Sequence, residues 1–515
     1  MIGNDSADLV YDPRPTLRDN GTAPGPPVNS YGAIQNHSIN HKHQTSPQPE
    51  TKDERHSANH SRVCGWVCIE IPVFLFFLSL NNSLPVTQYY LTAREYRDLG
   101  VPNVTGCSEG GEGEGGGASL LDTIQARVST YTMYLNFLGS LPAILPVLFM
   151  GSISHRYGRK VALYLVSLGA MARMAVFTLV FHYEWRVEYL YIGSVLEGMT
   201  GGFGCFLMSS YTIVADATKE GGSRRAVKIT LTEAATMLGS SAGLTMSGYW
   251  VRSLGYVAPL LFSAGLQVFV IIFLFLFVPE TVPSSPPTPI SCSILLKSLK
   301  VFLKKTPTGR RGLLLTSIAT FFMGILNLFG SNSIIVLYLL HYPFCWTETH
   351  ISVYTGVFIV SSWLMVLLTT HATSGRLADD SLALIGALSG LVGFLLQGLA
   401  NKDLFIYLGA GAALLSNMMW PMLRVIMSKA VDIHEQACLF AGIGVTEMLS
   451  TLVTGVLSPY VYKISLGRIH GLPFLGFSAI SFLGACCIVS LIARRKTREG
   501  KAQSVNGTSQ SSVTH

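Results

Sequence analysis

The feature that most constrains this chain is a succession of apolar stretches, each long enough to cross about 30 Å of hydrocarbon as a helix. Inside lipid every backbone polar group needs a partner within the protein, and a helix supplies all of them within one segment. With 49% hydrophobic and 13% charged residues, the chain is too apolar for a soluble protein of this length. We therefore expect an all-α membrane protein, and the predicted spans are 66-90, 127-150, 161-182, 188-215, 229-251, 257-278, 312-340, 350-371, 382-400, 404-428, 437-464 and 472-493.

The distribution of basic residues predicts the orientation of these twelve spans. An even number of spans places both termini on one side, and the loops on that side hold fifteen Lys and Arg against six in the opposite loops. Because basic loops stay in the cytoplasm, both termini are predicted to be cytoplasmic. The long Pro- and Ser-rich connection 279-311 divides the spans six and six, which is typical of the major facilitator fold.

This organisation predicts five regions. A disordered cytosolic tail is expected at 1-65, because it is polar and has no apolar signal segment. A first six-helix bundle then occupies 66-278, a cytosolic linker 279-311, a second six-helix bundle 312-493, and a C-terminal cytosolic tail 494-515.

Composition also argues against several classes of function. The formal charge of +7 resides in short loops, where it sets orientation, so no nucleic-acid partner is expected. The nine cysteines include no CxxC pair and no Cys/His cluster at metal-ligand spacing, so no metal site is predicted, and no cofactor is expected. The chain has no HExxH, no phosphate loop followed by Lys and no nucleophile elbow, and an enzyme is not expected.

Two predictions concern the loops on the expected outer side. Asn103 heads a glycosylation sequon in the first of them. Cys107 in the same loop and Cys345 in the fourth outer loop both face the oxidising compartment, so a disulfide would join the two bundles. Two unpaired thiols are the alternative, because sequence supplies no distance.

The loop after the second span resembles the signature gating loop of major facilitator transporters. In that loop glycines permit a tight turn, and an acidic residue pairs with arginines to latch the inner gate. Here the acidic position is His155, so we expect a latch without its usual negative partner and an inner gate that is weaker or pH-sensitive. The predicted gating residues are Gly151, His155, Arg156, Gly158, Arg159 and Lys160.

Ionisable residues inside apolar spans are costly and commonly functional. Glu233 is a candidate proton carrier, with a first-turn acid favoured by the helix dipole as the alternative. Arg424 is a candidate contact for carboxylates or phosphates, with interfacial snorkelling as the alternative. Structural ion pairing is the alternative for any member of the set, which comprises Glu70, Arg173, Glu197, Glu233, Arg424 and Glu447, with Asp216 at the inner end of the fourth span.

Several blocks in a specific order look like solute carrier family 46, the family of the proton-coupled folate transporter. They are Pro85-Val-Thr87-Gln88-Tyr89, Val214-Ala215-Asp216, Pro343-Phe-Cys345-Trp346, Ser428-Lys429, Glu435-Gln436-Ala437-Cys-Leu439-Phe440 and Gly471-Leu-Pro473-Phe474. The resemblance runs from about residue 66 to 493 and leaves out both polar tails.

This resemblance implies secondary transport driven by a proton gradient and a disulfide between Cys107 and Cys345. It implies proton coupling at Glu233 and at Asp216, the latter matching an acidic residue important to carrier function, and proton and substrate binding at Arg424. His155 and Leu328 stand where the folate carrier has an aspartate and a histidine, and these departures count against folate itself.

We therefore expect proton-coupled symport of a small organic anion by alternating access, the anion being folate-like, a muropeptide, a cyclic dinucleotide or a steroid conjugate. A non-transporting receptor or scaffold and an uncoupled facilitator are the alternatives. The partners are protons, the organic solute and the lipid bilayer, and a homo-oligomer is compatible with the sequence. The expected location is the plasma membrane or an endosomal or lysosomal membrane.

Overall fold

The computed structural model describes residues 68–100, 117–217, 222–280, 301–304, 310–373, 376–431 and 435–511. Within these ranges the chain forms helices and their connections, without a strand, so the expected all-α class is confirmed. The first half contains α2 (Glu70–Asp98), α3 (Gly117–Tyr157), α4 (Arg159–His182), η1 (Val187–Tyr189), α5 (Leu190–Met199), α6 (Gly202–Ala217), α7 (Gly222–Leu254) and α8 (Val257–Phe277).

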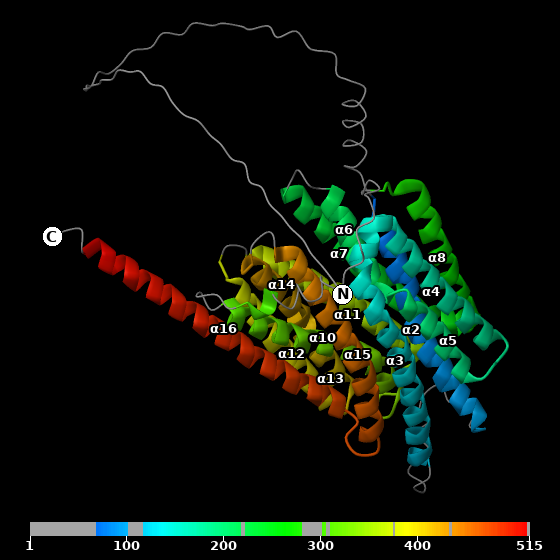
Figure 1. Ribbon diagram of the computed structural model, residues 1–515. Helices are drawn as coiled ribbons and strands as arrows, with labels where there is room; N and C mark the ends of the chain where they lie inside the picture. Colours follow the sequence, from blue (N-terminus) through cyan, green and yellow to red (C-terminus); the bar gives the residue numbers. More distant parts are fainter. Residues whose placement is uncertain are drawn as a thin grey trace, which may run out of the picture. The chain divides into compact units, whose positions relative to one another are not determined.

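The second half repeats this succession of long helices. It contains α10 (Arg310–Leu340), α11 (Glu348–Ala372), α12 (Asp379–Gly398), α13 (Asp403–Ala412), η2 (Ala413–Met418), α14 (Met419–Lys429), α15 (Gln436–Ser465) and α16 (Leu472–Ser511). Figure 1 shows α2 to α8 gathered beside α10 to α16, with α3 next to α15 where the halves meet.

Eight helical segments of the described chain are long and apolar enough to cross a membrane. They are Arg159–His182, Val187–Val214, Val257–Phe277, Arg310–Leu340, Glu348–Ala372, Asp379–Gly398, Asp403–Lys429 and Leu472–Arg495. The other four predicted spans fall on the long helices α2, α3, α7 and α15, whose sequences are richer in polar residues. The number of twelve spans stays a prediction.

Glycines allow the close contact between α2 and α7 inside the first half. A Cβ atom at Gly239 would lie 2.3 Å from the Phe74 carbonyl oxygen, and one at Gly243 would lie 2.4 Å from the Leu78 carbonyl oxygen. Lipid supplies no hydrophobic force between helices, so close backbone packing at small residues takes its place.

Small and hydroxyl residues also join the two halves, along α7 and α11. Ser241 donates a hydrogen bond to the Gly356 carbonyl at 2.8 Å, and the Ser247 hydroxyl lies 3.0 Å from that of Ser352. The Tyr89 hydroxyl of α2 lies 3.1 Å from the same serine hydroxyl. These bonds lie in the expected outer half of the helices.

Candidate functional site

Four polar side chains from four helices form a cluster inside the helical core. Tyr211 comes from α6 and Glu233 from α7, whereas Arg424 comes from α14 and Glu447 from α15. The cluster therefore takes two members from each half of the chain. We call these four residues the central cluster.

The second-half members form an ion pair. Arg424 donates from Nη2 to Glu447 Oε2 at 2.9 Å, and the two side chains keep 23% and 19% of their surface accessible. The guanidinium lies 4.8 Å from the centre of the Trp420 ring and 5.4 Å from that of Phe321. The salt bridge and the two aromatic rings together fix the orientation of the guanidinium plane.

The first-half members face this ion pair. The Tyr211 hydroxyl interacts with the Glu233 carboxylate, which interacts electrostatically with both Arg424 and Glu447. Glu233 lies about three turns into α7, because the helix begins at Gly222. The alternative that Glu233 is a first-turn acid is therefore wrong.

Arg424 is not left as an uncompensated cation inside the helical core. The Glu447 carboxylate neutralises the Arg424 guanidinium. This pairing stabilises the core, because an unpaired charge taken out of water costs several kcal/mol. Glu447 was among the candidate ionisable residues, but its pairing depends on helix packing. Nothing in the sequence marked Tyr211 as a site residue, because a tyrosine in an apolar helix is common.

The gating residues form a second polar group at the expected inner end of the first half. Arg159 Nε donates to Asp216 Oδ2 at 3.0 Å, and the backbone amides of Arg159 and Lys160 bond to the Glu280 carboxylate at 2.8 and 3.3 Å. Gly158 turns the chain there with φ 101°. A Cβ atom at this glycine would lie 2.5 Å from Glu280 Oε2, so the turn requires glycine.

The prediction of a latch without a negative partner is therefore wrong for Arg159, which pairs with Asp216 from the end of α6. Asp216 belongs to this latch and is not a member of the central cluster. Gly151, His155 and Arg156 lie on the last turns of α3, and their side chains fall outside the described residues.

The second half has a counterpart of this latch with the charges exchanged. Asp379 at the start of α12 accepts from Lys429 at the end of α14 at 2.6 Å, and Asp380 accepts from Arg495 of α16 at 3.0 Å. Helix α4 is the third long helix of the first half, and α12 is the third long helix of the second half. The two latches therefore occupy equivalent places in the two halves.

The remaining ionisable residues of the apolar spans form structural pairs. Glu70 accepts from Lys228 at 2.9 Å, and Glu197 accepts from Arg173 at 2.7 Å in a buried contact. The alternative of ion pairing is confirmed for these residues.

Predictions for the expected outer loops are tested only at one position. Cys345 is disulfide-bonded. Cys107, its expected partner, and the sequon residue Asn103 lie outside the described residues, so the pairing and the glycosylation stay predictions.

A family model described as Major Facilitator Superfamily matches residues 73–379. A curated chicken (Gallus gallus) relative, described as a lysosomal proton-coupled steroid conjugate and bile acid symporter, is 26% identical over 82% of this chain and 92% of its own length. The bovine (Bos taurus) proton-coupled folate transporter is 26% identical over 81% of this chain and 90% of its own length. These relatives confirm the resemblance to solute carrier family 46.

Solved structures show the same fold at lower identity. A human organic anion transporter superposes with a TM-score of 0.58 and 16% identity over 83% of this chain and 99% of its own. A peptide-transporter family member bound to 5-aminolevulinic acid superposes with a TM-score of 0.59 and 13% identity over 85% of this chain and 96% of its own.

Proposed function

Because the chain belongs to the major facilitator superfamily, a superfamily of transporters and not of enzymes, we propose that it moves a small organic anion together with protons across a membrane. The chain is a multi-pass membrane protein. Relatives that match over 90% or more of their own length are described as a proton-coupled folate transporter and a proton-coupled steroid conjugate and bile acid symporter, which supports an anionic substrate and proton coupling.

The observation that carries the proposal is the charge balance of the central cluster. One guanidinium, on Arg424, faces two carboxylates, on Glu233 and Glu447. With both carboxylates ionised, the cluster has a net negative charge and repels an anion. One proton removes that charge, so proton binding favours anion binding.

Linkage then determines the direction of coupling. If a proton on Glu233 improves the binding of an anion at Arg424, the anion improves the binding of the proton by the same factor. Both ligands would enter together and leave together, which is symport. Glu447 compensates the cation while no anion is bound, and the accessible fifth of the Arg424 side chain is where a substrate carboxylate or phosphate would bind.

The location of the cluster connects this chemistry to alternating access. Glu233 and Tyr211 belong to the first half, and Arg424 and Glu447 to the second, so their interaction changes when the halves rock. Neutralising Glu233 alters the attraction between the halves and therefore the balance of inward and outward states. We place the halves at 66-278 and 312-493, with 279-311 as the linker.

Asp216 contributes through the gating loop in this account. Its ion pair with Arg159, supported by Glu280, would hold the inner ends of α4 and α6 together in one state and release them in the other. Gly151, His155, Arg156, Gly158 and Lys160 complete the proposed gating loop.

We also propose a disulfide between Cys107 and Cys345, glycosylation at Asn103, and cytoplasmic termini. The plasma membrane and an endosomal or lysosomal membrane are the proposed locations. The lysosomal description of one relative supports the organelle.

Uptake into cells at outer pH 5.5 and 7.5 tests the proposal. Folate, a bile acid, a steroid sulfate, a muropeptide and a cyclic dinucleotide are offered to wild type, Glu233→Gln and Glu70→Gln. We expect acid to stimulate uptake of at least one anion in the wild type and in the control Glu70→Gln, whose carboxylate pairs with Lys228 outside the cluster.

Loss of the stimulation in Glu233→Gln would support coupling through this carboxylate. Uptake that is indifferent to pH in all three proteins would favour an uncoupled facilitator. No uptake of any anion, with the protein present in the tested membrane, would favour the receptor or scaffold.

A further inference from the structure

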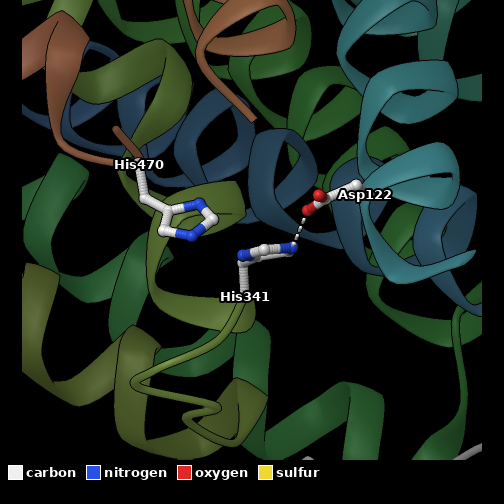
Figure 2. A group of neighbouring side chains, drawn as sticks. All are labelled: Asp122, His341 and His470. Atoms are coloured by element: carbon white, nitrogen blue, oxygen red, sulfur yellow. Dashed lines mark ion pairs between the residues drawn. The ribbon is translucent and has the colours of Figure 1, made fainter. Parts of the chain in front are cut away.

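A second group of ionisable side chains lies where the halves meet at the expected outer end, far along the helices from the central cluster. Asp122 is near the start of α3, His341 follows the last residue of α10, and His470 lies in the connection between α15 and α16. Figure 2 shows the three side chains converging from these separate segments. One donor atom from each lies within 4.8 Å of the others.

The closest contact in this group is between an acid and an imidazole. His341 Nε2 lies 3.1 Å from Asp122 Oδ1, but the two atoms lack the alignment of a hydrogen bond. The His341 and His470 rings lie 5.1 Å apart between centres. Within the described ranges Asp122 has no lysine or arginine as an ion-pair partner.

Two ring nitrogens of the group have unused hydrogen-bonding capacity. His341 is only 5% exposed, and its Nε2 has no hydrogen-bond partner among the described residues. The same is true of the buried Nδ1 of His470. Burying a polar atom without a partner is unfavourable, so two such atoms beside a carboxylate are well placed to bind a ligand.

The other nitrogen of His341 determines which tautomer is favoured. Nδ1 lies 2.9 Å from the Tyr342 carbonyl oxygen, and a donor at that position leaves the lone pair on Nε2. A lone pair facing a carboxylate oxygen is repulsive unless a cation lies between them.

We propose that Asp122, His341 and His470 bind a divalent transition-metal ion of the Zn²⁺ type. Two nitrogens and a carboxylate oxygen are a ligand set that Zn²⁺ accepts, with a fourth position left for water. Ligands at Zn²⁺ bond lengths are about 3.3 Å apart in tetrahedral geometry. The acid and His341 already have nearly this spacing, and rotation of the His470 side chain would bring in the third donor. The Nδ1 contact with Tyr342 would orient His341 as a ligand.

The ion would connect the two halves, because one ligand comes from the first half and two come from the second. It would therefore bind the conformation in which these outer ends meet and shift the population toward it. Zn²⁺ added on the outer side is expected to slow any cycle that requires the ends to separate.

The test measures Zn²⁺ bound per chain by equilibrium dialysis of the full-length protein in detergent micelles. Histidines of the N-terminal tail would also bind metal, so the background protein has glutamine at all five, namely His37, His41, His43, His56 and His60. Asp122→Asn, His341→Gln and His470→Gln are introduced singly. The control is His182→Gln, which removes an exposed histidine at the end of α4.

We expect the background protein and His182→Gln to bind one more ion than the cluster variants, whose affinity for this ion falls by about 100-fold or more. Asp122→His, which exchanges one ligand for another, should retain the ion. Elution of each variant as a folded monodisperse species separates loss of a ligand from loss of the fold.

An equal number of ions in the background protein and all three cluster variants would overturn the proposal, and so would loss of the ion in Asp122→His when the protein remains folded. In that case a protonated His341 paired with Asp122 would explain the contact. The dialysis requires no transport, so its outcome is independent of the proposed symport.

Discussion

Neutralising Arg424 and Glu447 one at a time and together tests how the central cluster is held. Two unit charges about 4 Å apart attract by about 4 kcal/mol at an effective dielectric of about 20. The salt bridge keeps about a fifth of each side chain accessible, so water screens part of this attraction and desolvation offsets more of it. We expect a net coupling of about 1 to 2 kcal/mol.

Arg424→Gln leaves the Glu233 and Glu447 carboxylates without a cation, and Glu447→Gln leaves the guanidinium with only the more distant Glu233. The arginine variant should therefore lose more stability than the glutamate variant. The double variant leaves Glu233 alone with Tyr211 and should be more stable than the sum of the single losses predicts.

The assay is thermal unfolding of the purified proteins in detergent at pH 7.5 and pH 5. The loss in Arg424→Gln should shrink at pH 5, because the carboxylates left without a cation take up protons. Strict additivity of the three variants at pH 7.5 would refute the coupling. A loss in Arg424→Gln that is the same at both pH values would refute the explanation from unpaired carboxylates.

Three further predictions concern the gating turn at Gly158, the ion pairs of Glu435 and the packing of α2 against α7. Gly158→Ala should destabilise the protein by about 1 to 3 kcal/mol, because the turn has φ 101° and the new Cβ would meet the Glu280 carboxylate. Thermal unfolding measures this loss of stability. An unchanged unfolding midpoint would contradict the prediction. Hydrogen bonds from Lys304 and Arg310 hold the pKa of Glu435 below its usual range. The contact therefore stabilises the fold fully at any pH above the ordinary glutamate pKa, and this stabilisation is lost only as the pH falls through the lowered pKa. Glu435→Gln should therefore have the same effect on the unfolding midpoint at pH 5.5 and 7.5, and an effect confined to pH 7.5 would contradict the lowered pKa. Gly243→Leu should separate α2 from α7 and abolish the monodisperse peak in size-exclusion chromatography, whereas Leu238→Ala at an exposed position of the same helix should leave it intact.

The sequence was sufficient to predict the fold class and three of the four members of the central cluster, but not Tyr211. Apolar length and loop charge depend only on local composition, which is why the helices carrying Glu233 and Arg424 were found without a structure. The long helix α7 shows the limit of this reasoning. Its expected span began at residue 229, but the helix begins at Gly222, and this difference moves Glu233 away from the first turn.

The partners of each residue could not be predicted, because pairing depends on how helices pack. Arg424 and Glu447 are on separate helices, and the same is true of Arg159 and Asp216. The absence of an acid at position 155 predicted a latch without a negative charge, but a residue from another helix supplies it. His341 and His470 lie in different connections, so no spacing rule brings them together.

The most direct test of proton-coupled transport is the movement of protons with the substrate anion. Purified wild type and Glu233→Gln are placed in liposomes that contain a pH-sensitive dye, and the anion identified by uptake is added outside at pH 5.5 without an imposed voltage. Symport predicts that the anion acidifies the lumen in wild-type liposomes, and that Glu233→Gln abolishes this acidification. Anion entry into wild-type liposomes without any acidification would contradict the account.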